Sequence, residues 1–141
     1  MKWLPLIARV LLGLVFLGSG IGGFVTHFAF PPDLPEGLKT FVTGLAASTY
    51  FLPLLKSTEI ACGLLLISGA FVPLALIVLA PIILNIFLTH LFLAPSGVPL
   101  ALVIGALEIY LAFFAKPYKE IVGQIFRCPM KESRVSARLK L

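Results

Sequence analysis

The sequence predicts an all-α, polytopic membrane protein, in which a four-transmembrane-helix bundle is followed by a short amphipathic C-terminal helix. Of the 141 residues, 60% are hydrophobic and only 12% are charged, whereas a soluble domain is about half apolar and about a quarter charged. The apolar residues gather in long runs separated by proline and glycine, as crossings of about 20 residues require. The alternating segments of about 10 residues that build a membrane β-barrel are absent.

The first apolar run covers residues 4–30 and is interrupted only by Arg9 and His27. We expect one transmembrane helix over this run. It should end at the proline cluster that begins at Pro31, because proline lacks a backbone donor and its ring clashes with the preceding turn.

The loop over residues 31–49 carries a weaker helical signal. Within it, Leu38, Phe41, Val42 and Leu45 recur at helical spacing. This pattern predicts a short helix that lies at the membrane surface.

Residues 50–94 include only one Lys, one Glu and one His, and at about 1.5 Å per residue they are far too long for a single crossing. Gly69 suits the end of one helix and Pro73 the start of the next. A second turn, rich in proline and glycine around residue 97, leads into a fourth helix. The predicted helices after the first cover residues 50–69, 73–94 and 98–115.

The last part of the chain is amphipathic and basic. Apolar side chains at i, i+3, i+4, i+7 and i+8 run from Tyr118 to Phe126, opposite charged ones, and predict an interfacial helix. Seven of the eleven Lys and Arg residues lie in residues 116–140, so no broad basic surface for nucleic acid is predicted. We divide the chain into a transmembrane domain, residues 1–115, and a basic amphipathic cytoplasmic tail, residues 116–141.

The distribution of Lys and Arg also predicts the topology, because basic residues are enriched in cytoplasmic segments. Lys2 and the basic tail belong on the cytoplasmic side, and the loop over residues 31–49, with one Lys and two acids, belongs outside. Four crossings place both termini on one side, which agrees. The two cysteines, Cys62 and Cys128, form no C-x-x-C pair and predict no disulfide framework.

Three polar residues of the predicted spans fall at similar depth. Glu59, Asn85 and Glu108 lie roughly 13–15 Å from the outer ends of their helices at about 1.5 Å per residue, which is near the bilayer midplane. We expect all three to face inward and to form one polar layer. Ionisable residues at such depth are costly and usually functional.

Each of these residues has a structural alternative. Lys56 and Glu59 share one helix face and could form an internal ion pair. Asn85 and Thr89 can hydrogen-bond between helices instead of to a ligand, whereas Glu108 has no cation in its own helix. The histidines lack an acidic partner, so no metal site is predicted. The candidate ligand-binding residues are Glu59, Asn85, Glu108, Lys56, Thr89 and His90.

Two further features of the first helix have packing explanations. Arg9 either extends to the inner membrane surface or pairs with an acid of another helix. Gly18 and Gly22 form a G-x-x-x-G motif that would let another backbone approach closely.

An Arg followed by G-x-x-F and S-G occurs in residues 9–20 (RVLLGLVFLGSG), and a Glu followed by G and L-x-x-G occurs in residues 59–69 (EIACGLLLISG). In these segments the chain resembles the DoxX-like family of small four-helix bacterial membrane proteins. Residues 81–97 are similar to the third helix of one subgroup. The resemblance covers about residues 4–115. The chain departs from the family pattern after the S-G pair. Many members carry a basic residue there, and this chain has Gly22-Gly23-Phe24.

The resemblance implies a four-helix bundle in a bacterial inner membrane. Some family members are subunits of thiosulfate:quinone oxidoreductase or of quinol oxidase complexes. The resemblance therefore implies quinone as a candidate cofactor and subunits of a redox complex as candidate partners.

Together these observations predict a membrane module that binds a hydrophobic molecule, such as a quinone or a lipid, at the midplane layer, as a subunit or accessory of a membrane redox complex. Its expected partners are membrane lipids, the ligand, and partner subunits or further copies of the chain. Two alternatives stay open. One is an enzyme resembling the sterol isomerases of the emopamil-binding group, in which buried carboxylates move protons. The other is a purely structural subunit.

Overall fold

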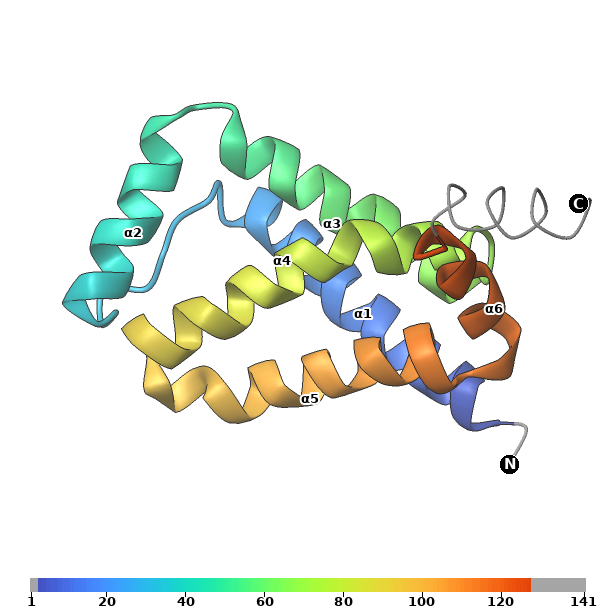
Figure 1. Ribbon diagram of the computed structural model, residues 1–141. Coiled ribbons are helices and arrows are strands. Elements are labelled where there is room, and N and C mark those ends of the chain that lie inside the picture. Colours follow the sequence, from blue (N-terminus) through green and yellow to red (C-terminus); the bar gives the residue numbers. More distant parts are fainter. Residues whose placement is uncertain (1–2, 128–141) are drawn as a thin grey trace, which may run out of the picture.

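The fold is all-helical, as the sequence predicts. The computed structural model describes residues 3–127, which form six α-helices, a 3-10 turn and a π-helical segment (Figure 1). Four helical stretches in this part of the chain are long and apolar enough to cross a membrane. In each of them only 28% of the most apolar window is buried inside the protein, so most of the span surface is available to lipid.

The first span, α1 (Leu4–Val25), ends earlier than predicted, and the expected continuation to residue 30 is wrong. The Thr26 hydroxyl donates back to the Gly22 carbonyl at 2.9 Å. His27 and Phe28 then adopt φ angles of 50° and 59°. Two successive left-handed residues cannot continue a right-handed helix, so the chain turns away before it reaches the prolines.

The predicted break between the second and third spans is confirmed. The helix α3 (Phe51–Ser68) ends at Gly69, whose φ of 80° is the left-handed conformation that glycine adopts without steric cost. Phe71 is also left-handed, with a φ of 51°, and α4 (Val72–Leu93) begins directly after it. Pro73 lies in the first turn of α4, where its missing N–H removes no helical hydrogen bond.

The fourth span is built from three consecutive segments. A 3-10 turn, η1 (Pro95–Gly97), leads into α5 (Val98–Ile109), which continues as the π-helical segment η2 (Tyr110–Phe114). The wider turn closes where the Ala115 N–H donates to the carbonyl five residues earlier, at 2.9 Å. Such π-helical turns are rare and often occur at functional sites.

Two short helices lie at opposite ends of the bundle (Figure 1). The helix α2 (Glu36–Ala47) crosses the end at which α1 finishes, and its apolar stripe is half-buried. The helix α6 (Lys116–Ile125) lies at the end at which α1 begins, and its Val122 is buried. Both confirm helices predicted from apolar periodicity. The predicted tail beyond residue 127 lies outside the described residues.

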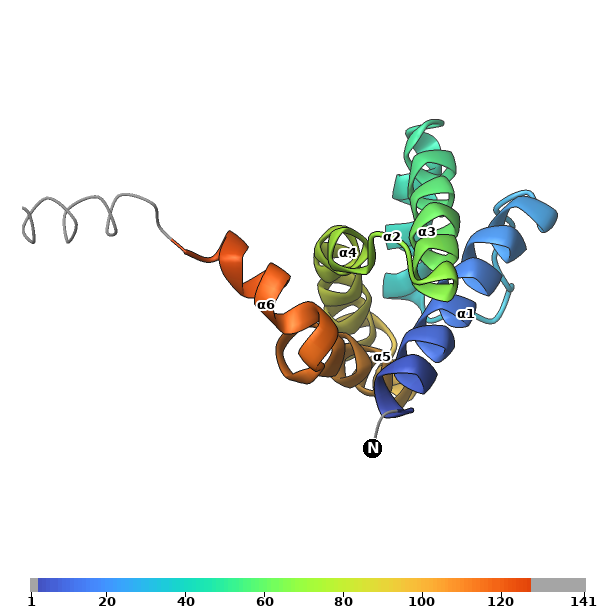
Figure 2. The same ribbon diagram turned by 90° about the vertical axis from the view of Figure 1, so that its right-hand side faces the viewer.

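Seen end-on, the four spans form two adjoining pairs (Figure 2). The helix α1 packs along α3, and α4 packs along α5, while contacts of α3 with α4 and of α1 with α5 join the pairs. Lipid is as apolar as the side chains, so close packing rather than exclusion of water holds such helices together. The large side chains that are fully buried in the shared core include Leu12, Phe16, Leu66, Leu76, Leu79 and Leu111.

Candidate functional site

A polar cluster joins α1 to α3 inside the bundle. Glu59 of α3 is 2% exposed, and its Oε2 accepts a hydrogen bond from Lys56 Nζ at 2.9 Å. The same Nζ donates to the Ser19 hydroxyl of α1 at 2.9 Å. The ion pair that the sequence left open for these two residues is therefore present, and the buried carboxylate has its counter-charge.

Glycines allow the two helices to approach this closely. A Cβ added to Gly20 or to Gly63 would come within 2.8 Å of a backbone oxygen of the other helix. The predicted G-x-x-x-G contact within the chain is wrong, because a Cβ on Gly18 or Gly22 would have nothing within 4 Å. The buried face of α1 passes through Phe16 and Gly20 at a four-residue step, and Gly18 points to the other side.

Glu108 of α5 has a different environment. Its side chain is buried, with 7% of the residue exposed, and among residues 3–127 its Oε2 has no hydrogen-bond partner. Small residues share this face of the span, where Ala101 and Ala112 are buried and Gly105 is half-buried. A buried polar atom without a partner costs roughly 1–3 kcal/mol, so this atom requires an explanation.

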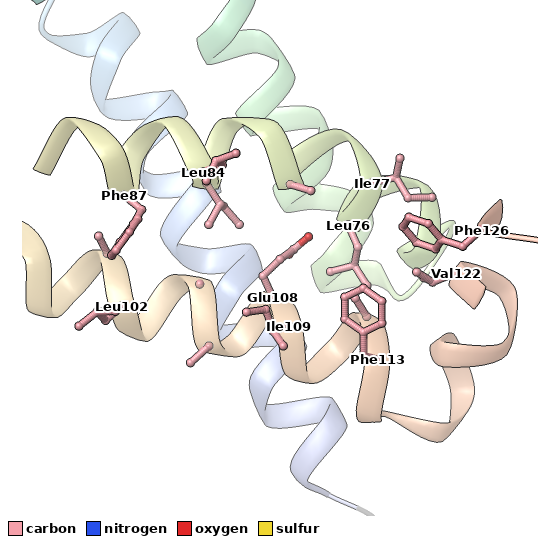
Figure 3. Close-up of a pocket in the computed structure, with 16 residues that line it drawn as sticks. Leu76, Ile77, Leu84, Phe87, Leu102, Glu108, Ile109, Phe113, Val122 and Phe126 are labelled. Carbon is pink, nitrogen blue, oxygen red and sulfur yellow. The ribbon is translucent and has the colours of Figure 1, made fainter. Parts of the chain in front are cut away.

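The Glu108 side chain extends from α5 toward α4 into a groove of about 520 Å³ (Figure 3). All other side chains that line the groove are apolar. Val122 of α6 and Phe126, which directly follows α6, lie at one end of it. Leu84 and Leu102, which are 57% and 54% exposed, lie along its rim. The groove is therefore open toward the surrounding lipid.

The structure does not bring Asn85 into a layer with Glu59 and Glu108. Asn85 is exposed and does not line the groove, so the inward orientation expected for it is wrong. The cause is the geometry of α4. Ile83 faces the core, and a residue two positions later points about 200° around the helix.

Thr89 and His90 are half-buried near the α2 end of α4. The His90 ring lies against Gly97 of the following turn, where an added Cβ would collide with it. Its Nδ1 is buried and has no hydrogen-bond partner in the described part of the chain. Neither residue lines the groove that contains Glu108.

A contact at the α6 end was not predicted from the sequence. The Arg9 guanidinium donates to the Tyr118 hydroxyl at 3.2 Å and lies against Gly69, where a Cβ would collide with it. In residues 3–127 no acid pairs with Arg9. Neither extension to the inner membrane surface nor pairing with an acid of another helix, the two expected roles, describes its contacts fully. One side chain thus connects α1, the turn between α3 and α4, and α6. The sequence feature that could have predicted this contact is Tyr118 itself, an aromatic residue with a polar end at the start of an apolar stripe.

Comparison with known proteins gives one match. The DoxX family model matches residues 4–94, which extend from the start of α1 to the end of α4 and leave out α5 with Glu108. No curated protein and no solved structure matches the chain. The matched region exceeds half of the chain and agrees with the resemblance seen in the sequence. This chain therefore belongs to the DoxX family and is a multi-pass membrane protein.

Proposed function

We propose that this DoxX family protein binds a hydrophobic molecule with one polar end, a quinone or a lipid, in the groove between α4 and α5. One observation carries the proposal, namely the buried Glu108 oxygen without a protein partner in an otherwise apolar groove. A ligand group that hydrogen-bonds to the Glu108 carboxyl group would offset the cost of burying it.

The shape of the groove supports a small hydrophobic ligand. Its volume of about 520 Å³ lies within the range of roughly 300–1,000 Å³ found for small-molecule sites. The exposed rim at Leu84 and Leu102 faces lipid, so a molecule dissolved in the bilayer can enter sideways. Gly105 and the alanines around Glu108 leave room for it.

The chemistry of a carboxyl group suits a quinone in both of its redox forms. When ionised, Glu108 can accept a hydrogen bond from a quinol hydroxyl, and when protonated it can donate one to a quinone carbonyl. The hydroxyl or ester carbonyl of a lipid could be held in the same two ways. We therefore assign the polar end of the ligand to Glu108.

We assign Lys56 and Glu59 to support of the bundle, because each provides the charge that the other needs. Proton transfer between two buried carboxylates, as in the isomerase alternative, would require Glu59 to be free of Lys56. The 2.9 Å contact between them therefore favours binding over that alternative.

We place the protein in the bacterial inner membrane with both termini in the cytoplasm, residues 1–115 as the transmembrane domain and residues 116–141 as the basic cytoplasmic tail. The concentration of Lys and Arg in that tail supports this orientation. The protein would act there as a subunit or accessory of a redox complex, and partner subunits would supply the electron-transfer centres.

The proposal is tested with two variants, Glu108→Gln and Gly105→Leu. Glu108→Gln keeps the size of the side chain but changes its charge and donor pattern. Gly105→Leu fills the groove with little strain, because an added Cβ would meet only Ile83 Cγ2, at 4.0 Å. We expect both proteins to stay folded, to copurify with less quinone or lipid by mass spectrometry, and to lose the thermal stabilisation that decylubiquinone gives the unmodified chain.

Two matched variants serve as controls. Glu36→Gln removes an exposed carboxylate of α2, and Gly18→Leu adds the same side chain at an exposed position with nothing within 4 Å of its Cβ. Both should keep the ligand content of the unmodified chain. Full ligand content in Glu108→Gln and Gly105→Leu, or no ligand in any form, would contradict the proposal.

A further inference from the structure

We infer that two copies of the chain pair through the outer face of α4, with Asn85 of one copy hydrogen-bonded to Asn85 of the other. This inference does not depend on the proposed ligand, because Asn85 does not line the groove.

The first observation is an amide without a partner inside a membrane span. Asn85 is the only asparagine of the chain and lies near the middle of the 22-residue α4. It is exposed, and it takes part in none of the side-chain hydrogen bonds formed within residues 3–127. Hydrocarbon offers no hydrogen bonds, so an amide exposed there is costly unless another protein group pairs with it.

A hydroxyl side chain can avoid this cost within its own helix in a way that asparagine cannot. The Thr58 hydroxyl of α3 donates to the Leu54 carbonyl one turn earlier, at 2.9 Å. An asparagine side chain has two N–H donors and an acceptor oxygen, and these cannot all be satisfied within its own helix. Asn85 therefore needs a partner on another helix.

The second observation is the pattern of the surface around Asn85. Exposed side chains follow α4 in alternating steps of four and three residues, which is the spacing of the contact seam between two helices wound around each other. The seam is about 27 Å long at 1.5 Å per residue, and Asn85 lies near its centre. Its members are Leu74, Val78, Pro81, Asn85, Leu88 and Phe92.

A second copy of the chain is the partner that fits Asn85. Copies inserted in the same orientation carry this residue at the same depth, so a two-fold axis along the membrane normal brings the two amides together. Each amide can then donate to the oxygen of the other, and no other polar residue is required. A single asparagine in an apolar seam fixes the register of paired helices in this way.

Within residues 3–127 no other span covers this face. Seen end-on, α4 borders α3 and α5 and has an outer side without another span (Figure 2). Ile77 and Leu84 of the groove border the seam, but no member of the seam itself lines the groove.

The test is disulfide crosslinking of the full chain in its membrane. In a background with Cys62→Ala and Cys128→Ala, one cysteine is introduced at Leu88 in the seam or at Val103 on α5, away from it. Both side chains are exposed, at 41% and 57%, and Val103 lies on another span. We expect mild oxidation to give a covalent dimer for Leu88→Cys and only monomer for Val103→Cys.

Addition of Asn85→Leu to the Leu88→Cys chain should weaken pairing by about tenfold, because interhelical hydrogen bonds of such side chains contribute roughly 1–2 kcal/mol in membranes. Its thermal stability as a monomer should not change, since Asn85 makes no side-chain hydrogen bond within residues 3–127. The inference is wrong if both cysteines crosslink equally, if neither crosslinks, if Leu88→Cys crosslinks only to a different protein, or if Asn85→Leu leaves the dimer unchanged.

Discussion

Glu59 and Glu108 are buried carboxyl groups whose surroundings give them different roles. Glu59 has an ammonium group at 2.9 Å, whereas the buried Oε2 of Glu108 has no partner in the described part of the chain. The sequence raised this contrast as one alternative, because Lys56 precedes Glu59 by three residues and no cation lies near Glu108 in α5. It could not orient Asn85, because α4 is apolar on all sides and its hydropathy marks no inner face.

The ion pair gives a stability prediction at this scale. Glu59→Gln leaves Lys56 without its counter-charge, and loss of one member of a buried pair typically costs about 3–5 kcal/mol. We expect the low end of this range, because the Lys56 side chain is 21% exposed and keeps its bond to Ser19. Thermal unfolding in detergent measures the effect.

The double variant Lys56→Met with Glu59→Gln is the control for this prediction. It removes the unpaired charge and should recover much of the lost stability. If the double variant is no more stable than Glu59→Gln alone, the loss does not come from an unpaired lysine, and the structural role given to this pair is wrong.

At the scale of elements, close packing of α1 on α3 depends on Gly20 and Gly63 and not on the G-x-x-x-G motif of α1. We predict that Gly63→Ala destabilises the protein by about 1–3 kcal/mol, because its Cβ would lie 2.8 Å from backbone atoms of α1. The matched variant Gly18→Ala should change stability by less than about 1 kcal/mol, since nothing lies within 4 Å of its Cβ. Thermal unfolding of both proteins checks this. Equal destabilisation would show that the helices do not pack in this register.

The docking of α6 gives a second prediction for an element. Tyr118→Phe removes the hydroxyl that accepts the Arg9 hydrogen bond and keeps the apolar ring. Loss of this bond should cost about 1 kcal/mol and should raise amide hydrogen exchange in α6. The spans should keep their protection. Unchanged exchange in α6 would mean that Val122 and its apolar neighbours hold this helix without Arg9.

For the whole molecule, apolar run length and turn chemistry were enough to predict the four spans, and apolar periodicity predicted both short helices. The boundaries that depend on Gly69 and Pro73 were correct because these residues restrict the local backbone directly. The early end of α1 was not predictable, since His27 and Phe28 rarely adopt left-handed φ angles. The groove was also not predictable, because residues that resemble a membrane-facing stripe, Val122 and Phe126, line it instead.

Topology is the prediction that concerns the whole chain. A reporter that works only in the cytoplasm should be active when fused after Leu141 and inactive when inserted near Glu36. The basis is the excess of Lys and Arg near the C-terminus and the position of α2 at the end of the bundle opposite α6 (Figure 1). The reverse pattern of activity would require both termini to lie outside.

The most direct test of the central claim is photoaffinity labelling of the full chain in membranes, with a quinone that carries a photoreactive diazirine beside its head group. After digestion, mass spectrometry identifies the labelled residues. Binding beside Glu108 predicts adducts on the groove-lining parts of α4 and α5, such as Ile83 and Gly105. An excess of decylubiquinone should suppress these adducts, and Glu108→Gln should reduce them. Labelling spread evenly over the lipid-facing surfaces, unaffected by either change, would contradict the claim.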